Sequence, residues 1–315
     1  MNNFAPCAGG EEPAVPALCR LFESGIIIKK GLTLFSMIFD MHVHMFPDFL
    51  APKALSGIGE TSHVPPVTKA TLSDTRTRLK EWGISGAAVL NIATRPEQQT
   101  NVNNWAAEVQ DDFFYCFGSV HPDAPDAVEE LWRIRGLGLF GVKLHPEYQR
   151  FFVDDKKAYP VYDALQELGL PVTFHAGWDP VSPHVVHTPP KALAKVARDF
   201  PRMTVIAAHM GGMRRSEEAE EYLIGMENVY LDTSMSYLLI DPEQAKRMIL
   251  HHGSERVLYA SDCPWSLPKE QMRFLERLGL PDRMLEDICW NNARRLLGLD
   301  KISGQKEPGT MRRII

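Results

Sequence analysis

The chain has 315 residues, of which 44% are hydrophobic and 23% charged, with a formal net charge of -6 at pH 7. This composition is typical of a globular protein with a sizeable core, and the acidic balance argues against a nucleic-acid-binding surface. No apolar run reaches the length of a membrane-spanning helix, and no Lys/Arg cluster predicts attraction to anionic lipids. The five cysteines lack paired spacing, which indicates reduced thiols. We therefore expect a cytoplasmic protein that acts on a small molecule, without a nucleic-acid or membrane partner.

The first 36 residues differ in composition from the rest of the chain. Residues 1–20 are rich in Pro, Gly, Ala and acidic residues, and the start carries none of the basic residues that a signal peptide requires. Met37 directly precedes the first convincing strand, so we hypothesise that translation begins there; the alternative is an ordered or frayed arm. We predict an N-terminal extension over 1–36 that is poorly ordered or not native, a barrel over 37–300 and a C-terminal tail over 301–315.

From Met37 onward, short apolar runs alternate with longer amphipathic stretches, as in repeated βα units. The eight apolar runs are Met37–His44, Gly86–Ile92, Phe113–Val120, Gly138–Leu144, Pro171–His175, Met203–His209, Val229–Thr233 and Val257–Ser261. Helical periodicity marks Ala158–Leu168, Pro190–Phe200, Glu217–Met226 and Pro242–His251. A last amphipathic stretch, Pro281–Leu299, predicts an extra helix that covers the barrel.

Polar residues at the ends of these runs distinguish a closed barrel from an open doubly wound sheet. They are His42, His44, His121, Lys143, His145, His175, His209, Asp232 and Asp262. In a barrel the carboxyl ends of the strands converge on one face, where active sites are built. We therefore predict an α/β fold, a (β/α)8 TIM barrel with an extra C-terminal helix. The sequence contains no GxxxxGK[ST], so a nucleotide-binding P-loop has no motif behind it.

Several of these end residues are of the types that bind metals. His42 and His44 lie two residues apart on one predicted strand, so both side chains project to the same face and can share a cation. His175 and His209 end apolar strands and are followed by small residues, and Asp262 follows the last strand. Each has an ordinary alternative, a core histidine bonded to a carbonyl or a carboxylate that caps a helix. Together they place ligand-type residues at one depth on strands one, five, six and eight.

The motifs DMHVHMFP, GVKLHPEYQRF, TFHAG, AAHMGG and YASDCPW, in this order, make the sequence resemble the amidohydrolase superfamily. More narrowly it resembles the amidohydrolase-related family, which includes the aminocarboxymuconate-semialdehyde decarboxylase branch. The resemblance extends from about Met37 to Leu299. It implies one divalent metal ion, most often zinc, with the ligands His42, His44, His175 and Asp262. It also implies that His209 contacts the metal-bound water or the substrate, and that the chain forms a homo-oligomer.

A cation held by neutral imidazoles and one carboxylate lowers the pKa of its water towards about 7. Asp262 can accept the proton and pass it to the leaving group, and His209 can polarise a carbonyl. We therefore expect a metal-dependent hydrolase in which a metal-bound hydroxide attacks the carbonyl of an amide, lactone or ester in a small anionic substrate. The alternative is a metal-dependent, non-oxidative decarboxylase of an unsaturated or aromatic carboxylic acid. A third interpretation is a non-catalytic barrel stabilised by its metal.

Four residues are candidates for substrate binding. Strand alternation puts Lys143 and His145 on one face, and we interpret Lys143 as an unmodified lysine that binds an anionic group beside His145. By analogy with binuclear members of the superfamily, the alternative is a carbamylated Lys143 that bridges two metals. Tyr148 and Trp178 lie in loops predicted to overhang the rim, where specificity loops occur. A packing role within its loop is the alternative for Trp178.

Three further groups of polar residues are softer candidates. Arg214 and Arg215 follow the Gly211-Gly212 turn and either clamp a carboxylate or begin a solvated helix. His121 is a candidate for lining the cavity, without a ligand partner among its neighbours. The tandem His251-His252 ends a helix, where a positive charge favours the helix dipole, and we predict a structural role for it.

Overall fold

The structure, a computed structural model, describes residues 37–300. The predicted extension over 1–36 and the predicted tail over 301–315 lie outside the described residues and stay predictions. Eight strands form one sheet in the order β1 to β8. Their bounds are Phe39–Val43, Gly86–Leu90, Phe114–Gly118, Gly141–Leu144, Val172–Phe174, Val205–Ala207, Val229–Asp232 and Val257–Leu258. Every neighbouring pair is parallel, and each predicted apolar run contains one strand.

Backbone hydrogen bonds join the last strand to the first. The amide of Met41 donates to the carbonyl of Tyr259 at 2.9 Å, directly after β8. Farther along, the amide of Asp262 donates to the carbonyl of His42 at 2.9 Å, and that of His44 donates to Cys263 at 2.7 Å. The bonds between β1 and the chain after β8 thus extend from Tyr259 to Cys263 and include the loop that carries Asp262. The predicted (β/α)8 barrel is confirmed, and its closure brings the ends of strands one and eight together.

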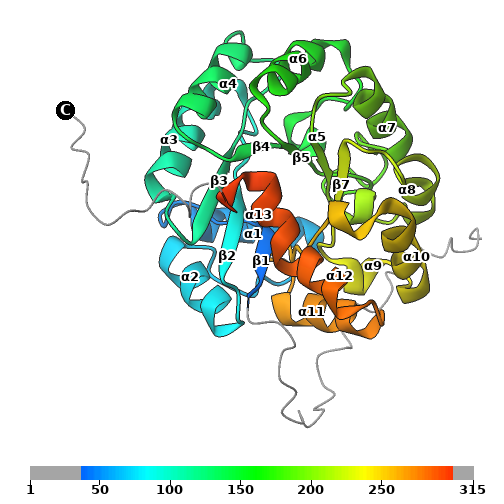
Figure 1. The fold of residues 1–315 in the computed structure, drawn as a ribbon. Helices are drawn as coiled ribbons and strands as arrows, with labels where there is room; N and C mark the ends of the chain where they lie inside the picture. Colours follow the sequence, from blue (N-terminus) through cyan, green and yellow to red (C-terminus); the bar gives the residue numbers. More distant parts are fainter. Residues whose placement is uncertain (1–36, 301–315) are drawn as a thin grey trace, which may run out of the picture. The chain divides into compact units, whose positions relative to one another are not determined.

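The helices surround the strands in an outer ring (Figure 1). The longer ones are α1 Ala51–Ser62, α2 Leu72–Glu81, α3 Gln99–Val109, α4 Ala127–Gly136, α6 Tyr159–Leu168, α7 Pro190–Asp199, α8 Ser216–Tyr222, α10 Pro242–His252 and α11 Pro268–Arg277. Short helices follow β4 and β7, namely α5 Pro146–Gln149 and α9 Ser236–Leu239. The helix predicted over 217–226 ends early, at Tyr222. It is followed by Gly225 at a φ of 85°, a left-handed conformation that a helix does not contain.

The predicted C-terminal helix over 281–299 is present as three consecutive segments. These are α12 Asp282–Glu286, a π-helical turn over Asp287–Asn291 and α13 Asn292–Leu297. Ala293 and Leu297 of α13 pack against apolar side chains of the barrel interior, and Trp290 contacts Phe39 at the first residue of β1, with ring centroids 6.2 Å apart. The segment therefore covers the amino-terminal end of the strands (Figure 1), which leaves the carboxyl ends for a site.

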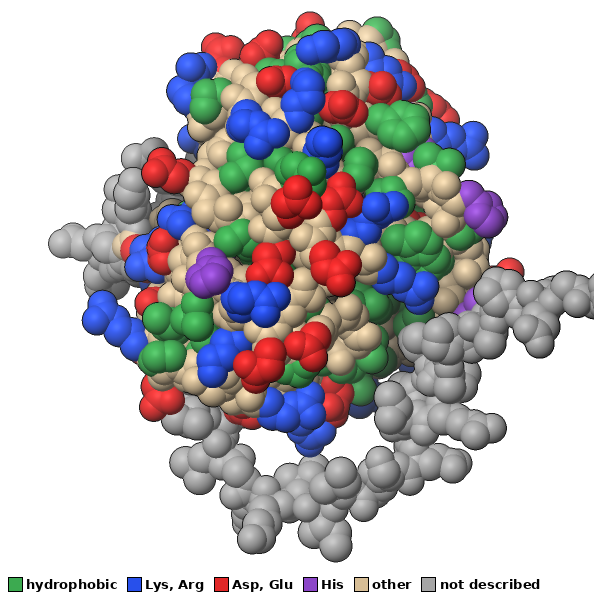
Figure 2. Space-filling view, turned by 90° about the vertical axis from the view of Figure 1, so that its right-hand side faces the viewer, with side chains coloured by type: hydrophobic (Ala, Val, Ile, Leu, Met, Phe, Trp, Pro, Cys, Tyr) green, Lys and Arg blue, Asp and Glu red, His purple; other side chains and the backbone are tan. Residues whose placement is uncertain are grey.

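Acidic and basic side chains are interspersed on the face that Figure 2 shows, without a large region of one sign. No helix within residues 37–300 has the length and apolar character needed to cross a membrane.

His252, the last residue of α10, is buried, and its ring links that helix to the sheet through hydrogen bonds. Its Nε2 bonds to the carbonyl of Val229 at 2.9 Å, and its Nδ1 accepts a hydrogen bond from the amide of Gly225 at 3.1 Å. A carbonyl accepts only, so Nε2 carries the proton and Nδ1 does not. Burial lowers the pKa of His252 to about 4. The structural role predicted for the tandem is confirmed for His252, which acts through these two hydrogen bonds and not through a charge at the helix end.

We expect acid to destabilise the fold partly through His252. The unfolded chain binds its proton near pH 6.5 and the folded chain only near pH 4, so this contribution to stability is lost as the pH falls through that window. His252→Gln removes both this dependence of stability on pH and the two hydrogen bonds of the His252 ring. The difference in unfolding free energy between the wild type and this variant should narrow by about 2 kcal/mol between pH 7 and pH 4.5, measured by denaturant titration. His251→Gln, at the exposed neighbouring residue, is the control; an unchanged difference for His252→Gln would contradict the interpretation.

Candidate metal centre

The predicted ligands meet at the carboxyl ends of the strands. His42 lies in β1, His44 directly follows β1, His175 follows β5, His209 follows β6 and Asp262 follows β8. All five side chains are buried or nearly so. The structure places three of them in one compact group and the other two, His175 and His209, in a second pair beside it.

His42, His44 and Asp262 form a triangle of donor atoms. The two Nε2 atoms lie 3.1 Å apart, and each lies 3.4 Å from Oδ1 of Asp262. Ligands placed about 2.0–2.1 Å from one ion at the corners of a tetrahedron stand about 3.3 Å from one another. The spacing of this triangle therefore fits a common divalent cation.

The outer nitrogen of each imidazole in this triangle has a fixed acceptor. Nδ1 of His42 donates to Oδ2 of Asp232 at 2.8 Å, and Nδ1 of His44 donates to the carbonyl of Leu90 at 2.8 Å. A neutral imidazole carries one proton, so both Nε2 atoms are bare and face each other as lone pairs. This arrangement, an acceptor behind each ring and a bare nitrogen in front, is typical of histidines that bind metals.

The second pair has the same proton arrangement. Nε2 of His175 donates to the carbonyl of Trp178 at 3.2 Å. Nδ1 of His209 donates to the hydroxyl of Ser234 at 2.8 Å, and that hydroxyl donates to Asp232. The remaining nitrogens, Nδ1 of His175 and Nε2 of His209, are therefore bare and 3.2 Å apart.

Burial keeps three of these rings, those of His42, His175 and His209, neutral. It lowers the pKa of His42 and of His175 well below the ordinary value, and it lowers the pKa of His209 to about 3, because a positive ring is poorly solvated here. In each of the two histidine pairs, two nitrogen lone pairs face each other without a proton between them. This arrangement is unfavourable unless a cation lies close to them. The residues present fit a divalent metal.

Lys143 of β4 is the unpartnered cation of the site. Its side chain is fully buried, and its Nζ has no hydrogen-bond partner within residues 37–300. Burial lowers the pKa of Lys143 to about 8, against the opposing attraction of Asp232 and Asp262. The amine is therefore poised to meet an anionic group that the chain itself does not supply.

A stack of three rings supports His175. Tyr148 lies on His145 with centroids 3.7 Å apart, and His145 lies on His175 at 4.4 Å, each pair within 13° of parallel. Oδ2 of Asp179 lies 3.7 Å from Nε2 of His145 and 3.6 Å from Nε2 of His175. Lone pairs lie in the plane of a ring, so parallel rings direct them side by side. His145, His175 and Asp179 thus bring donor atoms close enough to share an ion, but Nε2 of His175 is bonded to Trp178, and we interpret the stack as orienting His175.

Asp232 was expected at the rim of the barrel, but the sequence interpretation gave it no role. Its carboxylate accepts from His42, from Ser234 and, at 2.9 Å, from the amide of His209. It therefore orients one ring of each pair. Its place at the end of an apolar run was a usable signal, whereas Ser234 carried none.

Asp40 is a second missed residue, in the barrel interior two positions before His42. Its carboxylate accepts from the amide of His42 at 3.1 Å, from the amide of Ser261 at 2.9 Å and from the Ser261 hydroxyl. It ties β1 to the loop that carries Asp262.

The remaining candidates from the sequence are two loop residues, Trp178 and Arg214, together with Arg215 and His121. Trp178 lies half-buried in the loop after β5, and Arg214 lies exposed in the loop after β6. Arg215 pairs with Glu218 at the start of α8, which favours the helix-start interpretation for this residue. His121 is buried, and its Nδ1 accepts from the amide of Asp123.

Asp232→Asn should weaken metal binding by about 10- to 100-fold, since the outer partner of His42 then loses its charge. Competition with a chromogenic chelator measures the affinity, and circular dichroism checks that the barrel is retained. Asp241→Asn, at the exposed cap of α10, is the matched control. Equal affinity in the two variants would show that Asp232 does not orient a metal ligand.

A family model described as "Amidohydrolase" matches residues 39–299. Among curated proteins, none matches the chain significantly. Several solved structures share the fold. An uncharacterized TIM-barrel protein, Bb4693 from Bordetella bronchiseptica, is 22% identical with a TM-score of 0.66, over 83% of this chain and 98% of that one.

Two further structures carry named activities. A dihydroxybenzoic acid decarboxylase from Polaromonas sp. JS666, with bound manganese and the inhibitor 2-nitroresorcinol, is 16% identical with a TM-score of 0.64, over 87% of this chain and 100% of that one. A protein from Pseudomonas putida, provisionally assigned as a 2-pyrone-4,6-dicarboxylic acid hydrolase, is 18% identical with a TM-score of 0.58, over 84% and 99%. At these identities the likeness concerns the fold alone. With the family model covering the barrel from its first strand to the end of α13, the chain belongs to the amidohydrolase family.

Proposed function

We propose that this protein is a metal-dependent hydrolase that cleaves an amide, lactone or ester of a small anionic substrate. One divalent ion, zinc in our proposal, is bound by His42, His44, His175 and Asp262. The observation that carries the proposal is the set of bare imidazole nitrogens, 3.1 Å and 3.2 Å apart in their pairs, beside the Asp262 carboxylate.

A bound divalent ion supplies water activated at neutral pH and polarisation of a carbonyl oxygen. Oδ1 of Asp262 lies 3.4 Å from both β1 histidines, where it can hold a proton and deliver it to a leaving group. The bare Nε2 of His209 lies 3.2 Å from Nδ1 of His175, a proposed metal ligand, and in this proposal it orients the attacking water or the carbonyl. The backbone amide and Nδ1 of His209 are both tied, to Asp232 and Ser234, so that the ring is held in place.

Lys143 binds an anionic group of the substrate in this proposal, with His145, Tyr148 and Trp178 as further substrate-binding residues. The support is its burial and the lack of a hydrogen-bond partner for Nζ among the described residues. A carboxylate from the substrate would provide that partner as a charge-assisted hydrogen bond.

The second candidate function is decarboxylation, the named activity of several solved structures that share this fold. A departing carboxylate loses its charge as it becomes CO2, so a buried cation that binds it stabilises the ground state more than the transition state. Lys143 is such a cation. It therefore favours a reaction in which the anionic group is retained, and hydrolysis at another carbonyl satisfies this condition.

We also place the enzyme in the cytoplasm. Cys116, Cys263 and Cys289 are buried free thiols, as expected in a reducing compartment. Homo-oligomerisation stays a prediction of the family resemblance, which size-exclusion chromatography with light scattering would test.

Metal analysis of the purified protein by inductively coupled plasma mass spectrometry should find one divalent ion per chain. The alternative is a site with two metal ions. It is supported by His175 and His209, whose bare nitrogens form a second pair of donor atoms. In it, a carbamylated Lys143 bridges two ions. Two ions per chain, lost together in Lys143→Met, would contradict the single-ion centre and establish the bridged one.

A panel of lactones, amides, esters and unsaturated carboxylic acids, assayed with zinc or manganese, should show hydrolysis of a carboxylate-bearing member and no release of CO2. His175→Ala and Asp262→Asn should each lower kcat/KM by about 100-fold or more while the barrel stays folded, because both act at the reacting centre. Release of CO2 from an unsaturated acid, without turnover of any lactone, amide or ester, would support the decarboxylase instead. Full activity in metal-free protein would refute both.

A further inference from the structure

Two loops at the rim of the barrel are fastened to each other beside the metal centre. Trp178 donates to Met213 at 2.9 Å, and Met213 donates to Ala176 at 2.8 Å, while Gly177 donates to Thr188 at 2.9 Å within the loop after β5. Gly177 has a φ of 91°, and a Cβ there would stand 2.3 Å from the amide nitrogen of Met213. Only glycine permits this approach. The loop after β5 therefore has a fixed position relative to the loop after β6.

The same loop is bonded to a proposed metal ligand. The carbonyl of Trp178 accepts from Nε2 of His175 at 3.2 Å. The indole Nε1 of Trp178 donates to the carbonyl of Pro183, which fixes the ring from its outer side. The backbone of Trp178 is thus held by His175, and its indole ring is held by Pro183.

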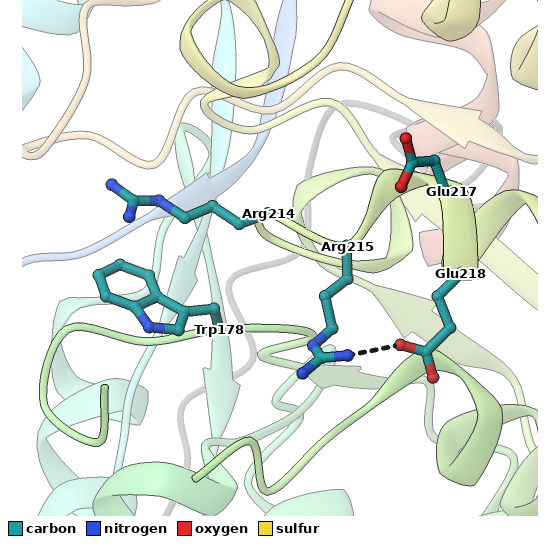
Figure 3. A pocket seen from close by; sticks show the side chains of 5 residues that line it. All are labelled: Trp178, Arg214, Arg215, Glu217 and Glu218. Atoms are coloured by element: carbon teal, nitrogen blue, oxygen red, sulfur yellow. Dashed lines mark hydrogen bonds and ion pairs between the residues drawn. The ribbon is translucent and has the colours of Figure 1, made fainter. Parts of the chain in front are cut away.

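Arg214, from the second loop, lies on the face of this indole. Its guanidinium carbon is 4.1 Å from the centroid of Trp178, and Figure 3 shows the two side chains against each other. They line an open depression of about 310 Å³ together with Arg215, Glu217 and Glu218. Arg215 is neutralised by Glu218 at 3.0 Å, and Glu217 lies apart from Arg214 in Figure 3.

Arg214 is the cation of this depression without a counter-charge. In the part of the chain that the structure describes, no carboxylate lies within ion-pair distance of it. Stacking uses the flat face of a guanidinium and leaves its N–H groups free at the edge, where they match the two oxygens of a carboxylate. Arg214 also has a φ of 54°, a conformation that costs a non-glycine residue about 1 kcal/mol and occurs often at ligand sites.

We propose that Arg214, positioned by Trp178, binds a carboxylate of the substrate that is remote from the bond being cleaved. This rests on the proposed function, because it takes the barrel mouth as the place where the substrate enters. It adds a recognition point on the rim to the buried Lys143. Arg214 would bind the carboxylate of the substrate, and the metal centre would bind its carbonyl group.

Equilibrium calorimetry with benzoate, on the full-length, metal-loaded protein, tests the proposal. Arg214→Gln should weaken benzoate binding by about 10-fold or more, whereas Arg215→Gln should leave it within about 2-fold of the wild type, because Arg215 is already paired. Benzamide, which has the same shape without the charge, should bind both variants and the wild type equally. Benzoate binding by Arg214→Gln that equals the wild type, or no benzoate binding by the wild type, would overturn the proposal.

Two variants of Trp178 separate positioning from mere packing. Trp178→Phe keeps an aromatic face and should retain most of the benzoate affinity, whereas Trp178→Leu should lose about as much as Arg214→Gln. Equal affinity in the Phe and Leu variants would show that the aromatic face does not position Arg214. Metal content and circular dichroism should be unchanged in all four variants.

The test stands apart from that of the proposed hydrolysis, because it measures binding without turnover. A chain that hydrolyses nothing in the substrate panel can still bind benzoate through Arg214. Conversely, a hydrolase whose benzoate affinity is unaffected by Arg214→Gln would keep its proposed function and lose this inference. With a carboxylate-bearing substrate in hand, Arg214→Gln should raise KM and leave kcat nearly unchanged.

Discussion

Burial of unprotonated imidazoles is the constraint on which the barrel mouth depends. His42, His44, His175 and His209 each give the proton of one nitrogen to an acceptor on the outer side and turn the bare nitrogen inward. A proton shared between rings would relieve the repulsion, but burial depresses the pKa values of His42, His175 and His209 and so opposes it. A divalent cation is the charge that such a set accommodates, and it satisfies the rings without protonating them.

The fold supplies what the local sequence cannot, which is proximity between residues far apart in the chain. Closure of the barrel between β1 and the loop after β8 puts the Asp262 carboxylate beside His42 and His44. The hydrogen bonds of Asp40 link β1 to the loop after β8. Those of Asp232 link His42 to His209. A buried carboxylate that accepts several hydrogen bonds holds its donors in narrow ranges of position, and metal affinity depends on such outer partners.

The periodicity of the chain was enough to predict the eight strands and their closure, because parallel barrel strands are continuous apolar runs with polar residues at one end. The pairing of His42 with His44 followed from strand alternation. Contacts across the barrel were not predictable in the same way. The bonds of Asp232 with His42 and Ser234, and the stacking of Arg214 on Trp178, depend on tertiary geometry that no local pattern records.

The grouping of the proposed metal ligands was likewise not predictable from the sequence. The sequence resemblance joins His175 to the β1 histidines and Asp262, whereas the structure places its inward nitrogen against that of His209. The C-terminal helix was predicted by its amphipathic pattern, but its π-helical turn adjusts the last turns to the barrel end and leaves no signal in the sequence. That His252 acts through hydrogen bonds and not through a charge was not predictable, because burial decides its protonation state, and burial is a tertiary property.

X-ray absorption at the edge of the bound metal tests the central claim most directly, because it reports which atoms surround the ion without requiring a known substrate. The account predicts a shell of nitrogen and oxygen atoms at about 2.0–2.2 Å with the multiple scattering of several imidazole rings, and no sulfur. A sulfur shell at about 2.3 Å, which would place a thiolate such as Cys263 on the ion, or a spectrum without imidazole scattering, would contradict it.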